Sequence, residues 1–490
     1  MSFPAGRKKA AKIKNVPRTI RFRLMLMIAV CLAWTGCAVG PDFKKPDAPV
    51  PERYTPAPLP AQTVAAAARA GEAQRFAFAA QLQGDWWRLF GSPRLDSLIQ
   101  QGIEQNPTLA AARAALVRAE EDLRAARGSL LFPAVNANLQ GSRQRTSANI
   151  GAGDSNTYNL FNASVAVSYT LDIFGGGRRQ MESYQAQVDY SRFQMEAAYL
   201  TLTSNIATTA ITQASLAEQI AATREMIAAE EKQLELFNKQ LELGAVSKAA
   251  VLTQEAQLAI TRAGLPPLEK QLEATRHALA VLAGEFPAVA QKAPFCLDSL
   301  RLPEDLPVSL PSSLARQRPD IQAAEAQLHQ ACAAVGVATA NLYPQITLSA
   351  GYGYASLSTD ILFTGQSLVW NLGAGLLQPV FRGGELLARR RSALAAYDQA
   401  AAQYRQTVLK AFQDVADVLR ALETDARSLQ AAVEAEAAAQ AALEMAEKQF
   451  ELGAVNFATL LTAKRDYQKT RFNVIAARTQ RFSDTAALFT

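Results

Sequence analysis

The sequence predicts an α+β membrane protein made of two internal repeats, each with two β-strands and a long helical hairpin. Two observations lead to this prediction. The pentapeptide Glu-Leu-Gly-Ala-Val occurs at Glu242–Val246 and again at Glu451–Val455, and the copies close stretches of 66 and 68 residues without glycine or proline. Either stretch is long enough for a helix of roughly 100 Å. Shorter segments in which apolar and small polar residues alternate predict the strands.

Further matching positions support the duplication. The offsets between copies lie between 207 and 212 residues, and the matches occur in the same order. A duplication of this kind fixes the architecture before single elements are assigned. We therefore place repeat 1 at residues 85–300 and repeat 2 at residues 301–490. The matching pairs are Pro107 and Pro319, Pro133 and Pro344, Phe174 and Phe381, and Gly244 and Gly453.

The first 36 residues have the features of a secretory signal. They contain eight Lys and Arg residues, no acidic residue, and an apolar run at Leu24–Trp34 that is too short to span a bilayer. The run leads to Gly36-Cys37, and a small residue before cysteine is what bacterial lipoprotein processing requires. We therefore predict a signal peptide at residues 1–36 and a covalent lipid on Cys37, with no other cofactor. Ala38, where an aspartate would favour the inner membrane, points to the outer membrane. Ordinary signal cleavage with a free Cys37 thiol is the alternative.

This segment also accounts for the basic balance of the chain. The formal net charge of +6 becomes −2 when residues 1–36 are removed. The mature chain therefore lacks the net basic surface that nucleic-acid binding uses, and no nucleic-acid partner is predicted. Cys296 and Cys332 could pair in an oxidising compartment or remain thiols, and the sequence leaves both possibilities open.

Residues 37–84 are predicted to form a lipid-anchored arm. Seven prolines occur between Pro41 and Pro60, and an alanine-rich segment follows them. This composition predicts an extended segment without a core of its own. The folded body is expected to begin at Asp85-Trp86-Trp87.

Each repeat then begins with a helix bounded by prolines. The helices are predicted to start at Pro107 and Pro319, because the first turn of a helix does not need the missing amide hydrogen. They are predicted to stop before Pro133 and Pro344, because proline disfavours helical backbone in the residue that precedes it.

The long helices and their return segments come last in each repeat. Gly244 and Gly453 are predicted to end the long helices in the left-handed conformation. The returning helix of repeat 1 is expected to be interrupted at Gly264–Pro267, where a glycine and two prolines cluster. The returning helix of repeat 2 has no such residues and is expected to run to Thr490.

Four segments alternate as strands do, namely Val135–Gln140, Phe161–Asp172, Gln345–Tyr354 and Leu368–Leu376. Strands that cross an outer membrane need about 9–11 residues, and small polar partners suit a water-filled lumen. Lipid does not tolerate open sheet edges, and four strands are too few to close a barrel. Several chains must therefore share one barrel, and three chains with twelve strands leave room for a channel. A four-stranded sheet on a soluble helical protein is the alternative.

Several segments resemble the TolC/OprM outer-membrane channel family, and most closely its NodT-type lipoproteins. They are Thr35–Phe43, Asp85–Phe90, Leu282–Pro287 and Arg318–Ile321, together with the two Leu-Gly-Ala-Val turns. The resemblance covers essentially all of the mature chain. It implies a trimer whose twelve-stranded β-barrel lies in the outer membrane and continues as a long periplasmic α-helical barrel.

The resemblance also implies a function and partners. The chain would be the passive exit duct of a tripartite efflux pump, carrying small molecules or drugs from the periplasm to the exterior, and would not be an enzyme. The implied partners are the homotrimer, a periplasmic membrane-fusion adaptor, an inner-membrane pump of the resistance-nodulation-division (RND) type, and outer-membrane lipid. A duct for type I protein secretion and a structural helical lipoprotein without a pore remain as alternatives.

The two hairpin turns are the predicted docking sites for the adaptor. Exposed turns on a rigid scaffold often carry recognition. By resemblance to the family, the residues of these tips are Gly244, Ala245, Val246, Gly453, Ala454 and Val455.

The family also narrows the periplasmic end with a ring of aspartates in the returning helix of repeat 2. In this sequence the matching position is Thr462, its repeat 1 counterpart is Thr253, and Asp466 lies one turn further on. The gate is therefore either anionic through Asp466 or neutral. A surface ion pair of Asp466 with Arg465 or Lys469 is the alternative for that residue.

The sequence gives little support to an enzyme or a metal site. The only histidines are His277 and His329, and a metal site at Glu325 and His329 would lack two further ligands, so a solvated helix pair is favoured. The glycines at Gly175–Gly177 are not followed by the Lys-Ser/Thr of a phosphate loop, and we interpret them as a strand-to-helix joint. The scarcity of methionine in the mature chain disfavours a dedicated copper or silver exporter.

Overall fold

The fold divides into two compact units, each containing segments of both repeats. The computed structural model describes residues 38–47, 53–78, 84–147, 155–289, 293–308, 313 and 316–489. Residues 120–187 and 327–400, with the arm up to Lys44, form one unit, here called the sheet unit. Residues 45–119, 188–326 and 401–490 form the other, here called the hairpin unit. The boundaries of the two sequence repeats therefore differ from the boundaries of the two compact units.

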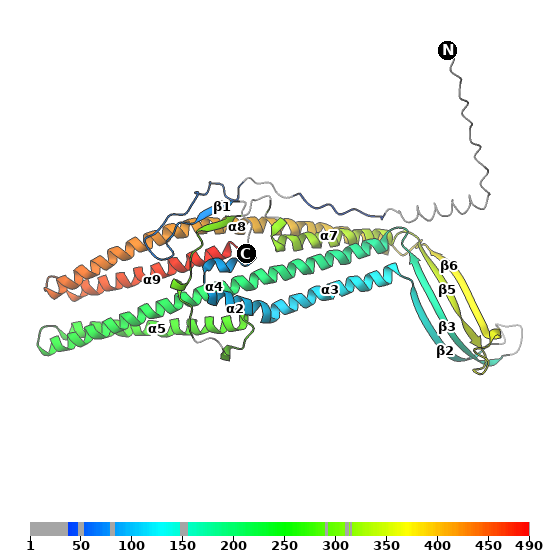
Figure 1. Cartoon of the computed structure of the whole chain (residues 1–490), viewed down its shortest axis with the longest axis horizontal. Coiled ribbons are helices and arrows are strands. Elements are labelled where there is room, and N and C mark those ends of the chain that lie inside the picture. Colours follow the sequence, from blue (N-terminus) through cyan, green and yellow to red (C-terminus); the bar gives the residue numbers. More distant parts are fainter. Residues whose placement is uncertain are drawn as a thin grey trace, which may run out of the picture. The chain divides into compact units, whose positions relative to one another are not determined.

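All four predicted membrane strands are present in the sheet unit. They are β2 (Ala134–Arg145), β3 (Thr157–Leu171), β5 (Gln345–Ser356) and β6 (Leu368–Leu377). The strands lie side by side in the order β2-β3-β5-β6, and every neighbouring pair is antiparallel (Figure 1). Within the described residues β2 and β6 are the edges of this sheet.

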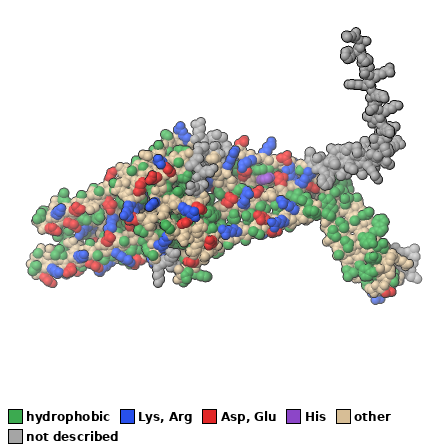
Figure 2. All heavy atoms as spheres, viewed as in Figure 1, with side chains coloured by type: hydrophobic (Ala, Val, Ile, Leu, Met, Phe, Trp, Pro, Cys, Tyr) green, Lys and Arg blue, Asp and Glu red, His purple; other side chains and the backbone are tan. Residues whose placement is uncertain are grey.

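The strand register collects the apolar side chains on one face. Val165 of β3 lies opposite Ala137 of β2 and Tyr352 of β5, and Tyr352 lies opposite Trp370 of β6. Directly opposed residues of antiparallel strands share a face, so the four apolar stripes form one continuous surface. Trp370 is 70% exposed in the single chain. Figure 2 shows hydrophobic side chains gathered over the strands, whereas charged side chains are scattered over the helices.

The opposite face of the same sheet is small and polar. Ser164 of β3 lies opposite Asn138 of β2 and Gly353 of β5, and Thr170 lies opposite Thr347. The two threonine hydroxyls are 3.3 Å apart. One apolar and one polar face on a fully antiparallel sheet is the pattern that a lipid-facing outside and a watery inside require.

The two helices predicted to start at prolines are present, within a few residues of the predicted bounds. Helix α3 covers Pro107–Leu131 and helix α7 covers Pro319–Ala340. The Oδ1 atom of Asn106 accepts hydrogen bonds from the amides of Thr108 (2.9 Å) and Leu109 (3.3 Å), which satisfies donors that the first turn leaves free. No helix within the described residues combines the length and the apolar character needed to span a membrane.

The two predicted long helices are also present. Helices α4 (Gly176–Glu242) and α8 (Glu385–Glu451) have 67 residues each. The returning helices are α5 (Lys248–Leu282) and α9 (Phe457–Ala487). Helix α9 is uninterrupted, as predicted, and Figure 1 shows the hairpins α4–α5 and α8–α9.

The predicted interruption of the first returning helix is wrong. Pro266 and Pro267 lie inside the continuous helix α5. Leucines on either side of them, Leu265 and Leu268, pack against a buried cluster that contains Leu272 and residues of α4. This packing outweighs the backbone hydrogen bonds that the prolines cannot make.

The core of the hairpin unit is built around aromatic side chains. The short 3₁₀ helix η1 (Trp86–Phe90) and helix α2 (Pro93–Gln105) precede α3, and α2 was not expected from the sequence. Trp86 and Trp87 are fully buried, and the ring of Trp86 stacks on Phe489 with centroids 5.2 Å apart. This core gathers the start of repeat 1 and the last turn of the chain.

The arm is more structured than its composition predicts. Strand β1 (Arg75–Phe78) pairs in parallel with β4 (Asp305–Val308), which connects the arm to the start of repeat 2. Phe76 is buried with Leu306 and Leu422. The alanine-rich sequence hides this strand, because only the partner strand and α8 supply the core that it lacks.

Candidate functional site: the hairpin turns

The turn of the first hairpin has the backbone of a Schellman cap. Gly244 adopts φ 76°, and its amide donates to the carbonyl of Leu241 at 2.9 Å. The amide of Ala245 donates to the carbonyl of Gln240 at 2.8 Å. These two bonds satisfy carbonyl groups that the end of α4 leaves unpaired, as the predicted left-handed cap requires.

The second turn repeats this geometry. Gly453 adopts φ 71°, with its amide on the carbonyl of Phe450 at 3.0 Å and the amide of Ala454 on Gln449 at 2.8 Å. A Cβ atom at Gly244 or Gly453 would meet no other atom within 4 Å. Glycine is therefore needed at both positions for its backbone conformation and not for space.

A polar side chain starts each returning helix immediately after the turn. The Ser247 hydroxyl accepts a hydrogen bond from the amide of Ala250 at 3.2 Å. The Asn456 Oδ1 atom accepts one from the amide of Thr459 at 3.0 Å. With a cap on both sides, each turn is a short segment of fixed shape.

Each fixed turn presents one leucine to solvent. Leu243 is 83% exposed and Leu452 is 85% exposed. Ala245 and Ala454 are also exposed, while Val246 and Val455 are partly buried. Exposed apolar side chains on a rigid turn are suited to contact with another protein.

Three phenylalanines hold the two turns together. Phe237 of α4 is fully buried, and its ring centroid lies 5.9 Å from Phe450 of α8 and 4.8 Å from Phe457 of α9. The rings of Phe450 and Phe457 are 6.0 Å apart. Sequence reasoning missed this cluster. Its only signal is that all three phenylalanines lie within seven residues of a turn glycine.

The two candidate gate threonines are exposed on their helices. The Thr253 hydroxyl donates to the carbonyl of Ala249 at 2.8 Å, and the Thr462 hydroxyl donates to Ala458 at 3.0 Å. Each hydroxyl therefore bonds to the backbone of its own helix one turn back. Neither threonine would add charge to a gate formed at these positions.

Asp466 is exposed and makes no ion pair with another described residue. The alternative pairing with Arg465 is not seen, because the Arg465 guanidinium donates to Gln257 Oε1 of α5 from Nε (2.9 Å) and Nη2 (2.6 Å). Lys469 also makes no ion pair among the described residues. The carboxylate is therefore available as the anionic gate candidate.

A buried carboxylate of α4 lies near the candidate gate residue Asp466, because it contacts Gln468 of the same helix α9. Glu230 of α4 is 4% exposed, and its Oε1 atom accepts hydrogen bonds from Thr261 (3.1 Å), Gln257 (3.4 Å) and Gln468 (3.4 Å). Burial lowers the pKa of nearby Lys464, whose Nζ donates to Gln233 Oε1 at 2.7 Å. This network joins α4, α5 and α9, and no periodic pattern along the chain predicts it.

The structure also shows the partners of Glu325 and His329, the residues considered for a metal site. The expected helix pair of Glu325 with His329 is wrong, because Glu325 pairs with Lys45 at 2.9 Å and His329 pairs with Glu182 at 2.8 Å. Each side chain reaches a partner outside its own helix, which local spacing could not show. No group of three or more His, Cys, Asp or Glu side chains that could hold a metal occurs among the described residues.

The structure also bears on the predictions for the cysteines and for the glycines at Gly175–Gly177. Cys37 lies outside the described residues. Cys296 and Cys332 are free thiols, the first exposed and the second buried. The joint at Gly175–Gly177 is confirmed, because it connects β3 to α4 and the amide of Gly177 donates to Asp172 Oδ1 at 3.0 Å.

Known proteins are similar to this chain in sequence and in fold. Residues 98–285 and 310–490 match the family model described as Outer membrane efflux protein. The chain is 32% identical to the pyoverdine export outer membrane protein OpmQ of Pseudomonas aeruginosa, over 82% of this chain and 86% of that protein. It is 30% identical to the toluene efflux pump outer membrane protein TtgC of Pseudomonas putida, over 93% of this chain and 92% of that protein.

Solved structures agree with the fold. The outer-membrane channel OprN matches with a TM-score of 0.82 and 25% identity, over 92% of this chain and 98% of that one. The MtrE outer membrane channel of Neisseria gonorrhoeae, solved in an open state, matches with a TM-score of 0.79 and 26% identity, over 92% of this chain and 97% of that one. The predicted channel fold and the resemblance to this family are therefore confirmed. The chain, an outer-membrane component of an efflux system, belongs to the outer membrane efflux protein family.

Proposed function

We propose that three copies of this chain form the passive exit duct of a tripartite efflux pump. The strand register carries this proposal. It gives one sheet with an apolar face, a polar face and two edges, β2 and β6, that no described strand of the same chain covers. In lipid such edges must be paired, and pairing β6 of one copy with β2 of the next closes twelve strands from three chains.

The proposed cargo is a small molecule, and the duct itself does no chemistry. OpmQ is named for pyoverdine export and TtgC for toluene efflux, and both of these compounds are far smaller than a protein. This favours a small-molecule duct over the type I secretion alternative. Energy for transport would come from an inner-membrane pump of the RND type.

Native mass spectrometry of the mature protein in mild detergent tests the assembly. We expect a mass of three chains, each starting at Cys37 and carrying a covalent lipid. Conductance in planar bilayers should accompany the trimer, because only a pore conducts. A monomer that persists after gentler extraction, or a trimer that never conducts, would contradict the duct and favour the structural lipoprotein.

The hairpin turns are the proposed docking sites for a periplasmic membrane-fusion adaptor. Support comes from Leu243 and Leu452, which are exposed on turns of fixed shape. A photo-crosslinking residue at Ala245 or Ala454 should capture a membrane-fusion adaptor in cells. Adding Leu243→Ser with Leu452→Ser should reduce that capture, whereas Leu236→Ser, at a half-exposed leucine of α4, should not. Equal capture in both variants would remove the turns from the proposal.

Asp466 is the proposed gate residue, since three copies would place three carboxylates at the narrow end of the duct. A ring of carboxylates favours cations in a pore. We expect Asp466→Asn to reduce the cation selectivity of the bilayer current, and Thr462→Val to leave it unchanged. If Asp466→Asn has no effect on selectivity, the gate is neutral and formed at Thr253 and Thr462.

A further inference from the structure

The first described residues of the arm lie against the junction between sheet and helices. The amide of Val39 donates to the carbonyl of Phe174 at 3.0 Å. Phe174 lies between the end of β3 and the start of α4. A Cβ atom at Gly175, which has φ 76°, would come within 2.5 Å of Ala38 Cα. The chain therefore runs in direct backbone contact with this joint.

Two further glycines let the arm lie directly on helix α7. Gly40 adopts φ 95°, and a Cβ atom there would come within 2.6 Å of Gly336 Cα. A Cβ atom at Gly336 would in turn come within 2.7 Å of Arg179 Cγ. Glycine inside a helix costs about 1 kcal/mol relative to alanine. Its presence at position 336 is explained by the space that the arm and Arg179 need.

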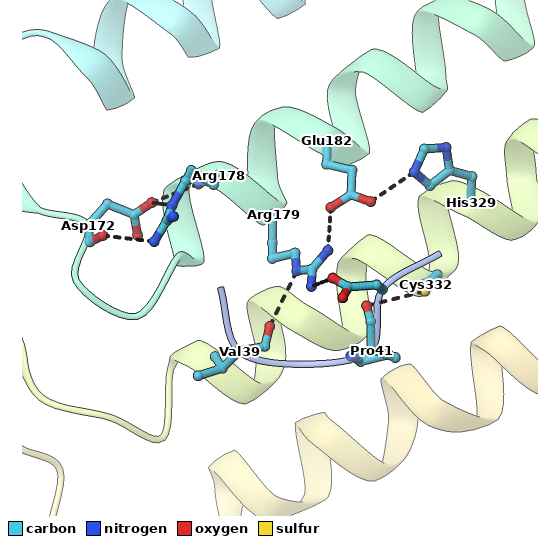
Figure 3. A network of polar contacts seen from close by, with 9 residues as sticks. Val39, Pro41, Asp172, Arg178, Arg179, Glu182, His329 and Cys332 are labelled. Atoms are coloured by element: carbon cyan, nitrogen blue, oxygen red, sulfur yellow. Dashed lines mark hydrogen bonds and ion pairs between the residues drawn. The ribbon is translucent and has the colours of Figure 1, made fainter. Parts of the chain in front are cut away.

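Arg179 of α4 is the centre of the contact (Figure 3). Its side chain is 6% exposed, and its Nη2 atom donates to Asp42 at 2.5 Å, its Nη1 atom to Glu182 at 2.7 Å, and its Nε atom to the carbonyl of Val39 at 3.3 Å. Burial by itself would lower the pKa of Arg179, but the hydrogen bonds that it donates to Glu182 and Asp42 raise the pKa. A buried guanidinium needs such partners, and the arm supplies two of the three.

The next residues of the arm contact helix α7. The Phe43 ring stacks on His329 with centroids 4.2 Å apart and planes at 15°. His329 Nε2 lies 2.8 Å from Glu182 Oε1, so Glu182 joins both arm contacts. The carbonyl of Pro41 covers the buried Cys332 thiol, with the sulfur 3.6 Å away. Burial raises the pKa of Cys332.

We propose that residues 38–43 are a clasp that docks across α4 and α7, joins the two repeats at the end of the sheet, and fixes where the lipid anchor meets the folded protein. Helix α4 belongs to repeat 1 and α7 to repeat 2, and no other part of the arm bridges them in the described sheet unit. Val39 follows Cys37 by two residues, which reach at most about 7 Å. A docked clasp therefore limits the length of chain between a lipid on Cys37 and the folded protein. Only this last consequence depends on lipidation of Cys37.

Cys332 gives a direct measure of clasp opening. The experiment uses the full-length mature protein with Cys296→Ser, which removes the exposed thiol, and follows maleimide labelling of the Cys332 peptide by mass spectrometry at one fixed pH. Labelling should be slow in this background. Asp42→Asn should speed it about tenfold, because a charge-assisted hydrogen bond to Arg179 is lost.

Matched variants separate the clasp from general loosening. Asp47→Asn removes the same charge from another exposed position further along the arm, one that makes no ion pair with a described residue, and should leave labelling unchanged. Phe43→Ala should speed labelling, and Phe43→Tyr should restore protection because the ring stack is kept. Unchanged labelling in Asp42→Asn, or equal acceleration in Asp47→Asn, would overturn the clasp.

Two further readouts keep the result interpretable. The mass of the assembly and its bilayer current should be the same in Asp42→Asn as in the parent. A parent protein that protects Cys332 but forms no conducting trimer would contradict the duct and leave the clasp standing. If Asp42→Asn does not fold, the clasp is tested by comparing Cys332 labelling in Phe43→Ala and Phe43→Tyr, because both variants keep the charge network of Arg179. Equal labelling rates in these two variants would overturn the clasp.

Discussion

The two repeats have the same turn geometry, but the ends of their hairpins far from the turns are packed differently. That end is apolar in repeat 1 and charged in repeat 2. With Gly244 aligned on Gly453, the positions occupied by Leu216 and Leu272 in repeat 1 are occupied by Asp425 and Arg481 in repeat 2. The leucines form an apolar cluster with Ile220. Arg481 is fully buried, and burial together with the neighbouring Asp484 raises the pKa of Asp425 to about 7.

The difference has a visible cause in the arm. Arg481 Nη1 donates to the carbonyl of Ala70 at 2.7 Å, and Nη2 bonds to Thr63 at 3.3 Å and to the carbonyl of Glu72. The arm therefore lays its backbone carbonyls on α9, where a buried donor is needed. Helix α5 makes no such hydrogen bond with the described arm, and at the matching position its Leu272 packs in an apolar cluster. The two hairpins, which share their turn geometry, thus differ where the described arm lies against only one of them.

The largest expected effect comes from giving repeat 2 the residue of repeat 1. Arg481→Leu leaves the buried carbonyl of Ala70 and the partly buried carbonyl of Glu72 without their guanidinium donor, and it removes the cation beside Asp425. Breaking a buried charge network of this kind costs about 3–5 kcal/mol. Chemical denaturation monitored by circular dichroism should show this loss. A change below about 1 kcal/mol would mean that arm and helix are not coupled.

Truncating the counterpart in repeat 1 should cost less. Leu272→Ala removes apolar contacts with Leu216 and Ile220, which is worth about 2–3 kcal/mol at a site that can partly relax. The same denaturation experiment measures it, and proteolysis of the arm should be unaffected. In Arg481→Leu the arm loses its hydrogen bonds to α9, so proteolysis should cleave the arm faster there. Equally fast cleavage in Leu272→Ala would contradict the inference that only the hairpin of repeat 2 depends on the arm.

The charged end of the repeat 2 hairpin should make stability depend on pH. The Asp425 pKa is raised in the folded protein from an ordinary value of 3.8 to about 7. Folding therefore favours the protonated form, and stability is lost as the pH rises from about 4 through 7. Asp425→Asn should flatten the fall in Tm between pH 5 and pH 8 and be most stabilising at pH 8. Leu216→Asn, at the matching position of repeat 1, should not change the slope.

The smallest effects are expected at the shared turns. Gly244→Ala and Gly453→Ala each force a side chain into positive φ, at a cost of about 1 kcal/mol, with no clash because the space is open. The two losses should be equal within the precision of denaturation curves. A clearly larger loss at one glycine would show that its turn carries contacts that the other lacks.

Features with a local cause could be predicted from the sequence. The strands β2, β3, β5 and β6 follow from alternation, α3 and α7 from their prolines, and the turns from Gly244 and Gly453. The continuous helix through Pro266 and Pro267 could not be predicted, since the packing of Leu265 and Leu268 that holds it comes from another helix. Strand β1 was missed for the same reason.

The candidate docking turns and gate also combine features that could be predicted from the sequence with contacts that only the structure shows. The positions of the turn residues and of Asp466 came from the repeat and the resemblance. That Arg465 bonds to Gln257, leaving Asp466 unpaired among the described residues, came only from the structure. The phenylalanine cluster at Phe237 and the buried Glu230 network also join residues more than 20 positions apart.

The sequence by itself determined the duplication, the helix lengths, the strand pattern, the turn geometry and the predicted signal, because each depends on neighbouring residues or on a fixed period. Only the tertiary structure decided how the arm is used. It places Asp42 on Arg179 and the carbonyls of Ala70 and Glu72 on Arg481. Burial of a charged group depends on which distant segment covers it, and no local pattern records that choice.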